Sequence, residues 1–247
     1  MYKILAPLAL LLAGTAPAHA QTVDGAVEGD AILKDFAFHT GEKLPEIKMH
    51  YTTLGKPRRD KQGRIANAVM ILHGTGGTGK QFFQPQFAGE LFGPGQLLDT
   101  RKYYIILPDN IGHGGSSKPS DGLRMKFPRY DYNDMVGAQY RMLTEKLGVK
   151  KLKLILGTSM GCMHAFVWGE TRPDFAEKLA PFACLPVEIA GQNRMWRTLS
   201  IDAIKADPLW QDGNYQEPPA AGLRTAASLS MIAGANPYAL QAQYPTR

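Results

Sequence analysis

Several common features are missing from the sequence, and each absence narrows what the protein can be. Only two cysteines occur, Cys162 and Cys184, so there is no cysteine cluster of the kind that holds a metal ion. The apolar run Ile4–Ala13 is too short to span a bilayer. No internal repeat or recognised nucleic-acid-binding motif is present. The last histidine is His164, so the chain after it offers no imidazole.

The first twenty residues have the pattern of a cleavable export signal. Lys3 supplies a positive charge, an apolar stretch follows, and Ala18-His19-Ala20 matches a small-x-small cleavage site. We therefore expect a signal peptide at 1–20, a mature chain that starts near Gln21, and a periplasmic or secreted protein. No cysteine follows the cut, so we expect no stable membrane anchor; a membrane-tethering N-terminus is the alternative.

Export would place the two cysteines where disulfides are permitted. Cys162 lies in an expected helix and Cys184 near the end of an expected strand. The sequence leaves open whether they form a bridge or stay free and buried, because spacing alone does not supply the geometry.

The charge balance does not indicate a nucleic-acid partner. The net charge is +6, with much of the excess in Lys56–Arg64 and Lys150–Lys153. No aromatic residues interleave these groups, so we expect solvated surface in both places. Association into a homo-oligomer is left open.

Short apolar runs alternate with helical patterns, which predicts an α/β fold with a mainly parallel sheet flanked by helices. We expect strands at Ala31–Phe38, Glu46–Thr53, Ala68–Leu72, Tyr103–Leu107, Leu152–Leu156 and Leu179–Cys184. A helix is expected over Asp131–Leu147, and Gly77–Phe92 is expected to be loop and short helix. After Pro186 only helical patterns remain, at Asn193–Ala206 and Ala220–Ala233. We therefore expect a core over 21–186 and a helical lid over 187–247.

The pattern G-x-S-x-G occurs once between an expected strand and an expected helix, at Gly157–Gly161. A strand, a tight turn and a helix are the context in which this pattern exposes a nucleophilic serine. Ser159 is therefore the candidate nucleophile. The alternative is a serine in an ordinary strand-to-helix turn.

Acyl transfer to a serine needs two N–H donors for the negatively charged oxygen of the intermediate. The backbone N–H of Met160, directly after the serine, is the first candidate, and Thr75 in the glycine-rich run His73–Gly79 is the second. A phosphate-binding loop is the competing interpretation of this run. It fails because Gln81 stands where that motif requires serine or threonine.

No residue is a convincing general base. Asp109 and His113 lie in a glycine-rich turn, and we expect them to have structural roles. His164 lies on the helix that follows Ser159, where we expect a packed side chain.

Three segments resemble the α/β-hydrolase superfamily and, within it, the homoserine O-acetyltransferase-like group. Gly157–His164 resembles that group's elbow, G-G-S-M-G-G-M-Q, although Thr158, Cys162 and His164 depart from it. Phe127-Pro128 with Asp134–Val136 and Gln139 is similar to that group's helix ahead of the elbow strand. Ala206–Trp210 with Gly213–Tyr215 and Gly222-Leu223 is similar to its lid.

The resemblance implies a serine nucleophile, ping-pong acyl transfer or hydrolysis, no metal and no cofactor. In the family's chain order the aspartate or glutamate and the histidine of the triad follow the serine. They would lie beyond position 247, so we expect an α/β-hydrolase core whose last strands are missing and whose catalysis is impaired.

The expected function is a periplasmic serine hydrolase acting on an ester, a thioester or a lactone, so the expected partner is a small-molecule acyl substrate. Export argues against homoserine acetylation, because acetyl-CoA is a cytosolic donor. A homoserine O-acetyltransferase whose N-terminus has been misread is one alternative. A non-catalytic binding module is the other.

Overall fold

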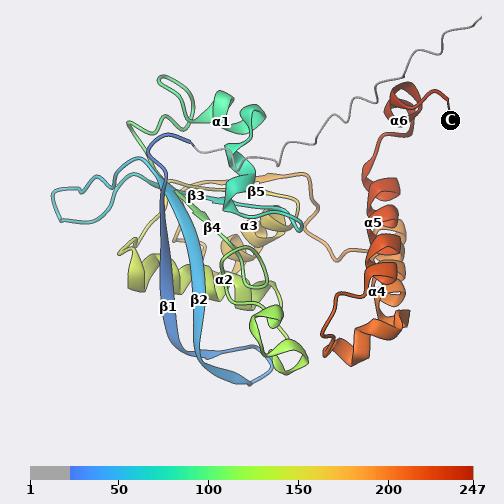
Figure 1. The fold of residues 1–247 in the computed structure, drawn as a ribbon. Helices are drawn as coiled ribbons and strands as arrows, with labels where there is room; N and C mark the ends of the chain where they lie inside the picture. Colours follow the sequence, from blue (N-terminus) through green and yellow to red (C-terminus); the bar gives the residue numbers. More distant parts are fainter. Residues whose placement is uncertain (1–22, 247) are drawn as a thin grey trace, which may run out of the picture.

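The computed structural model describes residues 23–246, and the expected signal peptide at 1–20, with the expected mature start at Gln21, lies outside them. Six strands form one mixed sheet in the order β1-β2-β4-β3-β5-β6 (Figure 1). Their bounds are β1 Val27–Ala37, β2 Lys43–Leu54, β3 Ala68–Leu72, β4 Tyr104–Pro108, β5 Leu154–Thr158 and β6 Leu179–Phe182.

The expected antiparallel pair is confirmed: β1 pairs with β2, and β2 joins β4 in the same antiparallel sense. The strands β4, β3, β5 and β6 are mutually parallel, as expected for an α/β fold. Parallel neighbours need crossover connections, which the helices between these strands supply.

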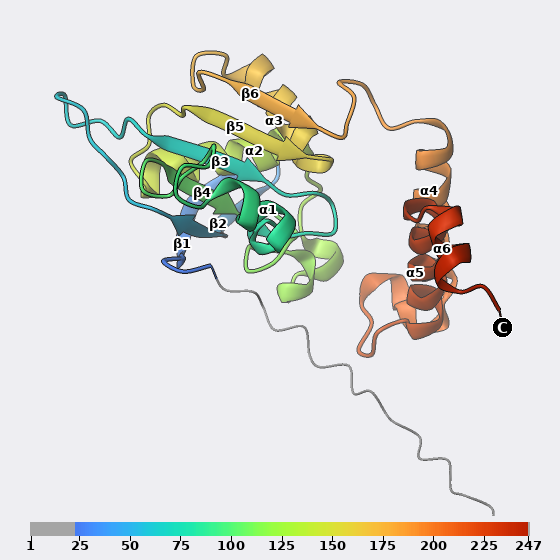
Figure 2. The same ribbon diagram turned by 90° about the horizontal axis from the view of Figure 1, so that it is seen from above.

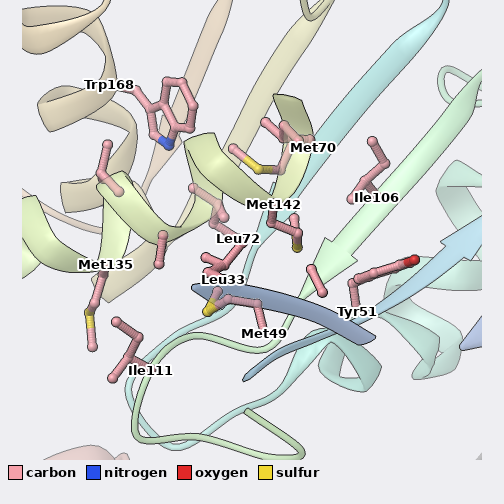
Figure 3. Close-up of a cluster of buried hydrophobic side chains, with 14 of the residues drawn as sticks. Leu33, Met49, Tyr51, Met70, Leu72, Ile106, Ile111, Met135, Met142 and Trp168 are labelled. Atoms are coloured by element: carbon pink, nitrogen blue, oxygen red, sulfur yellow. The ribbon is translucent and has the colours of Figure 1, made fainter. Parts of the chain in front are cut away.

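Two apolar layers cover the two faces of the sheet, because successive side chains of a strand point to opposite sides. In β3, Met70 and Leu72 belong to the layer beneath helices α2 (Tyr132–Arg141) and α3 (Met160–Thr171). Figure 3 shows this larger cluster, with Trp168 of α3 near the strands. Val69 and Ile71 face the other layer, formed with the 3₁₀ helix η1 (Gly79–Phe83) and helix α1 (Pro85–Leu91).

The helix expected over Asp131–Leu147 begins as predicted but changes character near its end. Asp131 caps α2 and its carboxylate accepts hydrogen bonds from the N–H groups of Asn133 and Asp134. From Met142 to Lys146 the chain continues as a π turn. The helix therefore keeps its predicted extent while its hydrogen-bond spacing widens in the last turn.

The strand β6 lies at one edge of the sheet in the described part of the chain. Leu179 and Phe182 are exposed there, at 39% and 54%. An exposed apolar sheet edge is what a core without further strands on that side presents to solvent.

The segment after β6 leads to a helical unit that stands apart from the sheet (Figure 2). It contains α4 (Gly191–Ala206), the 3₁₀ helix η5 (Pro208–Gly213), α5 (Ala220–Gly234) and α6 (Pro237–Gln243), the last of which was not predicted. The helices α4 and α5 pack closely, because a Cβ at Gly222 would lie 2.5 Å from the backbone oxygen of Ala203. The carboxylate of Asp207 also accepts the N–H of Gly222.

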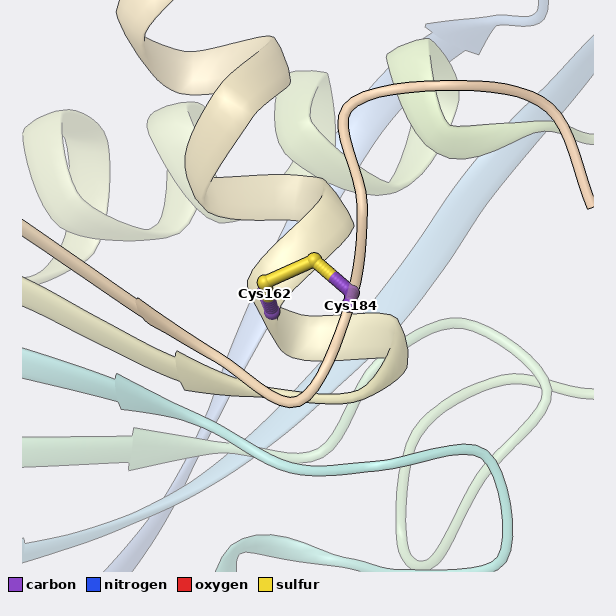
Figure 4. Close-up of a disulfide and its surroundings, with 2 residues drawn as sticks. All are labelled: Cys162 and Cys184. Atoms are coloured by element: carbon purple, nitrogen blue, oxygen red, sulfur yellow. A yellow bond between two sulfur atoms is a disulfide. The ribbon is translucent and has the colours of Figure 1, made fainter.

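Cys162 and Cys184 form a disulfide, with their Cα atoms 6.0 Å apart. It joins the first turn of α3 to the segment that leaves β6 (Figure 4). Among residues 23–246, no helix is both long and apolar enough to cross a membrane.

Candidate active site

Ser159 lies on the sharp turn between β5 and α3, and its backbone has a φ of 53°. A positive φ is unfavourable for a residue with a Cβ, so the surrounding structure must enforce it. The backbone N–H of Ser159 donates to the carbonyl oxygen of Phe182, at 2.9 Å, and its own carbonyl oxygen accepts from Met163. These bonds hold the turn between the end of β6 and the start of α3.

The two glycines of the G-x-S-x-G pattern are required by close backbone approach. A Cβ at Gly157 would lie 2.0 Å from the backbone oxygen of Gly161, and a Cβ at Gly161 would lie 2.2 Å from that of Leu72. The helix α3 therefore begins almost in contact with the ends of β3 and β5. The strand, turn and helix expected around Ser159 are all present.

The loop that carries Thr75 lies beside Ser159. A Cβ at Gly74 would be 3.4 Å from the Cβ of Ser159. A pocket of about 410 Å³ is lined by Ser159, Met160 and Thr75, with α4 contributing Asn193 and Arg197. In residues 23–246, neither the N–H of Thr75 nor that of Met160 donates to another protein group. The two residues that carry these unpaired N–H groups therefore line the same pocket as Ser159.

Buried His73 fixes the peptide that presents Thr75. Its Nε2 accepts the backbone N–H of Asn110, so the ring proton is on Nδ1, which donates to the carbonyl oxygen of Gly74 at 2.8 Å. The C=O and N–H of one trans peptide point in opposite directions. Anchoring the Gly74 carbonyl inward therefore turns the Thr75 N–H outward.

Two further side chains hold the loop. Gln81 accepts the N–H of Gly74 and approaches the hydroxyl of Thr158, so it joins the loop to the elbow. His113 Nε2 lies 2.7 Å from the carbonyl oxygen of Thr75. Lys80, which a phosphate-binding loop would aim at its ligand, pairs with Glu28 instead.

A chain of buried polar side chains continues behind the loop. The amide of Gln139 donates to Asn110 Oδ1 and accepts the indole N–H of Trp168 at 2.7 Å. The amide nitrogen of Gln139 also lies 3.2 Å from His164 Nδ1. Such networks are costly when incomplete and rigid when complete. The sequence contains these residues, but their pairing depends on partners more than twenty residues apart.

The residues set aside as bases have other partners. Asp109 accepts the N–H groups of Gly79 and Gly115, as expected for a structural carboxylate. Burial lowers the pKa of His73 to about 4 and that of His164 to about 3, so both are neutral near pH 7. In the described residues no side chain hydrogen-bonds to the hydroxyl of Ser159, although His164 Nε2 is buried without a partner. The serine thus has free N–H donors beside it but no base in contact.

One group of side chains in the described range has the spacing of a metal site, His39, Asp131 and Asp134. Both carboxylates already accept backbone N–H groups at the start of α2, and Asp134 also bonds to the ring of His39. These contacts account for the cluster as a helix cap.

The chain is similar in sequence and in structure to known proteins. Residues 67–240 match the family described as alpha/beta hydrolase fold. A homoserine O-acetyltransferase of Thermobifida fusca is 32% identical over 197 residues, covering 74% of this chain and 50% of that protein. The structure of the acetyl esterase MekB superposes with a TM-score of 0.77 and 28% identity, covering 87% of this chain and 61% of that one.

An acetylester hydrolase from Corynebacterium glutamicum also has a TM-score of 0.77, with 27% identity and coverage of 88% of this chain and 61% of that one. The chain spans about half the length of the curated relatives it matches. The chain therefore belongs to the α/β hydrolase fold family and, within that family, is similar to the homoserine O-acetyltransferase group.

Proposed function

We propose that the protein is an exported serine hydrolase that transfers the acyl group of an ester, thioester or lactone to Ser159 and then to water. The observation that carries this proposal is the position of Ser159. It stands on a positive-φ turn and shares its pocket with the two free N–H donors of Thr75 and Met160. Donors fixed before the reaction stabilise the negative charge that develops on the carbonyl oxygen of the substrate.

The chemistry would run in two steps. The oxygen of Ser159 attacks the acyl carbon, the bond to the leaving group breaks, and the leaving group takes up a proton. Water then attacks the acyl-serine, and the carboxylic acid departs as the serine regains its proton. Each step needs a base, and residues 23–246 hold none in contact with the hydroxyl. We therefore expect slow turnover, of the order that the donors and binding alone support.

The export part of the proposal rests on residues 1–20 and is supported by the disulfide Cys162–Cys184. Disulfides persist in oxidising compartments and are rare in the cytosol. The substrate we propose is a small acyl compound. Detection of the chain in the cytosol with residues 1–20 intact would contradict export.

The test is covalent labelling by a fluorophosphonate, with the labelled residue located by mass spectrometry. We expect the chain to label slowly at Ser159, and we expect added imidazole, which supplies a free base, to accelerate the labelling. Ser159→Ala should not label. Ser228→Ala is the matched control, because Ser228 bonds only to a carbonyl of its own helix.

Two results of this experiment would count against the proposal. Fast labelling that imidazole does not change would mean that a base is already in place. His73, His113 and His164 would then be the candidates for that base. No labelling under any condition would mean that Ser159 is not a nucleophile. Binding of acyl compounds that survives Ser159→Ala, again without labelling of the unaltered chain, would favour a binding module.

An acyltransferase is the second candidate, because the curated relative from T. fusca is named a homoserine O-acetyltransferase. The two activities differ only in the acceptor of the acyl group. Incubating the acyl-serine form with homoserine in water separates them. Formation of O-acylhomoserine in preference to the free acid would replace the hydrolase proposal.

A further inference from the structure

One wall of the Ser159 pocket is a segment without regular structure that connects β6 to α4. It contributes about half of the lining residues: Ala183, Cys184, Leu185, Val187, Glu188, Ile189 and Ala190. Leu185 and Val187 are more than 60% exposed. Within the described part of the chain, none of the residues 185–189 takes part in a hydrogen bond or an ion pair. Hydrogen bonds and ion pairs therefore do not fix the position of residues 185–189.

Two ties hold the start of this wall against the elbow. The first is the hydrogen bond from the N–H of Ser159 to the carbonyl oxygen of Phe182. The second is the disulfide from Cys184 to buried Cys162, three residues after the serine (Figure 4). Between the ties Ala183 has a φ of 61°, a conformation that a residue with a Cβ adopts only under constraint.

The same wall also lines a larger apolar cavity. That cavity has a volume of about 1030 Å³ and lies along α3 and β6, with Phe166, Val167 and Leu179 in its lining. Leu185, Val187 and Ile189 line both spaces. Movement of the wall away from Ser159 would therefore join a pocket of about 410 Å³ to this apolar space.

We propose that the disulfide Cys162–Cys184 determines which acyl groups reach Ser159, by holding the wall 183–190 against the elbow so that short acyl groups fit and long chains are excluded. The inference rests on the proposed function, because it assigns the acyl class of that site. Without the disulfide one tie remains, Ala183 relaxes, and the wall moves outward. Long alkyl chains then gain apolar contacts that the closed pocket denies them.

The test compares the unaltered protein with the double variant Cys162→Ala/Cys184→Ala. Two p-nitrophenyl alkylphosphonates, methyl and octyl, serve as probes that phosphonylate Ser159 with release of p-nitrophenol. We expect the ratio of the octyl to the methyl rate constant to rise by at least about tenfold in the variant. Saturation curves should assign most of this rise to tighter binding of the octyl probe, which a merely stabilising disulfide would not change.

Reduction of the folded, unaltered protein by a phosphine should reproduce the change. The phosphine converts the disulfide to two thiols and becomes its oxide, with water supplying the oxygen and the two protons. This experiment also tests the proposal if the double variant does not fold. The same treatment should leave the double variant unaffected, since the described residues hold no other cysteine. An unchanged ratio after reduction overturns the proposal.

Amide hydrogen exchange provides a readout that does not depend on chemistry at Ser159. Exchange of the Ser159 N–H, which donates to the carbonyl oxygen of Phe182 at the start of the wall, should accelerate when the disulfide is absent, and unchanged exchange also overturns the proposal. If neither probe labels Ser159 in either protein, the proposed function fails and the selectivity role fails with it. Faster exchange would in that case show that the disulfide still fixes the wall, so the two failures are distinguishable.

Discussion

The two sides of the Ser159 pocket are held in different ways. On one side, the peptide between Gly74 and Thr75 is held by His73, with Gln81 and Asn110 bound around it. On the other, the segment 183–190 is exposed and is tied at its start by one backbone hydrogen bond and one disulfide. The side that would meet developing charge is held by many buried contacts, whereas the position of the side that would meet the acyl chain depends on these two ties. Donors fixed before the reaction suit catalysis.

The largest expected effect comes from a substitution where α3 begins against the end of β3. Gly161→Ala places a Cβ 2.2 Å from the backbone oxygen of Leu72, which the sheet holds in place. We expect a loss of about 3 kcal/mol or more in the free energy of unfolding, measured by urea denaturation. Gly137→Ala is the control: it lies in α2 with nothing within 4 Å of its Cβ position, and should stabilise the protein by about 0.5–1 kcal/mol. Equal losses in both variants would contradict the close-approach argument.

A second prediction removes the backbone N–H donor of Thr75. Thr75→Pro lacks the backbone N–H, so we expect the rate of fluorophosphonate labelling at Ser159 to fall by about 10²–10³-fold. Thr75→Ala keeps the N–H and should label at nearly the rate of the unaltered protein. Melting curves check that both variants are folded. Equal labelling of the two variants would exclude Thr75 as a donor.

The side held by buried contacts should also make the protein sensitive to acid. Burial lowers the pKa of His73 to about 4 and that of His164 to about 3. At pH values between the ordinary pKa of histidine and these lowered values, the unfolded chain binds protons that the folded chain does not. Stability therefore falls as the pH falls from about 6.5 to about 4, with His73 alone contributing on the order of 3 kcal/mol. His164→Gln, which cannot titrate, should flatten the plot of melting temperature against pH. A slope as steep as that of the unaltered protein would contradict this assignment.

The smallest effect is expected at His39, away from the buried network, and it has the opposite sign. The hydrogen bond to Asp134 raises the pKa of His39 above its ordinary value. The contribution of His39 to the stability of the folded state is therefore fully present below about pH 6.5. It is lost as the pH rises through the raised pKa. His39→Ala should lower the melting temperature near pH 5 and have little effect near pH 9. A similar decrease at both values would mean that packing, not charge, is lost.

The strands and the elbow could be predicted from the sequence because their signals are local. The run Ala68–Leu72 is buried on both faces, and its bounds agree with those of β3. The elbow glycines are likewise enforced by neighbours that the strand-turn-helix pattern implies. The helix α6 was missed because Pro237–Gln243 contains no buried residue and so leaves no apolar period.

Other parts of the site could not be predicted because they depend on contacts between distant segments. The sequence leaves the disulfide open, since the bond depends on where β6 ends relative to α3. The pairing of Gln139 with Asn110 and Trp168 joins residues 29 positions apart in each case. The roles of Ser159, Thr75 and Met160 stay predictions, as do the boundaries of the core and the lid at 186 and 187.

The helical unit that follows β6 is held together mainly by contacts within itself. Asp207 and Gly222 join α4 to α5, while contact with the sheet domain beyond the connecting segment is concentrated where Met125 and Arg124 meet Gly213 and Tyr215. Sequence changes on the pocket face of α4 therefore have few routes by which to disturb the elbow. Substitutions within α4 and α5 are therefore expected to affect the stability of this helical unit more than that of the sheet.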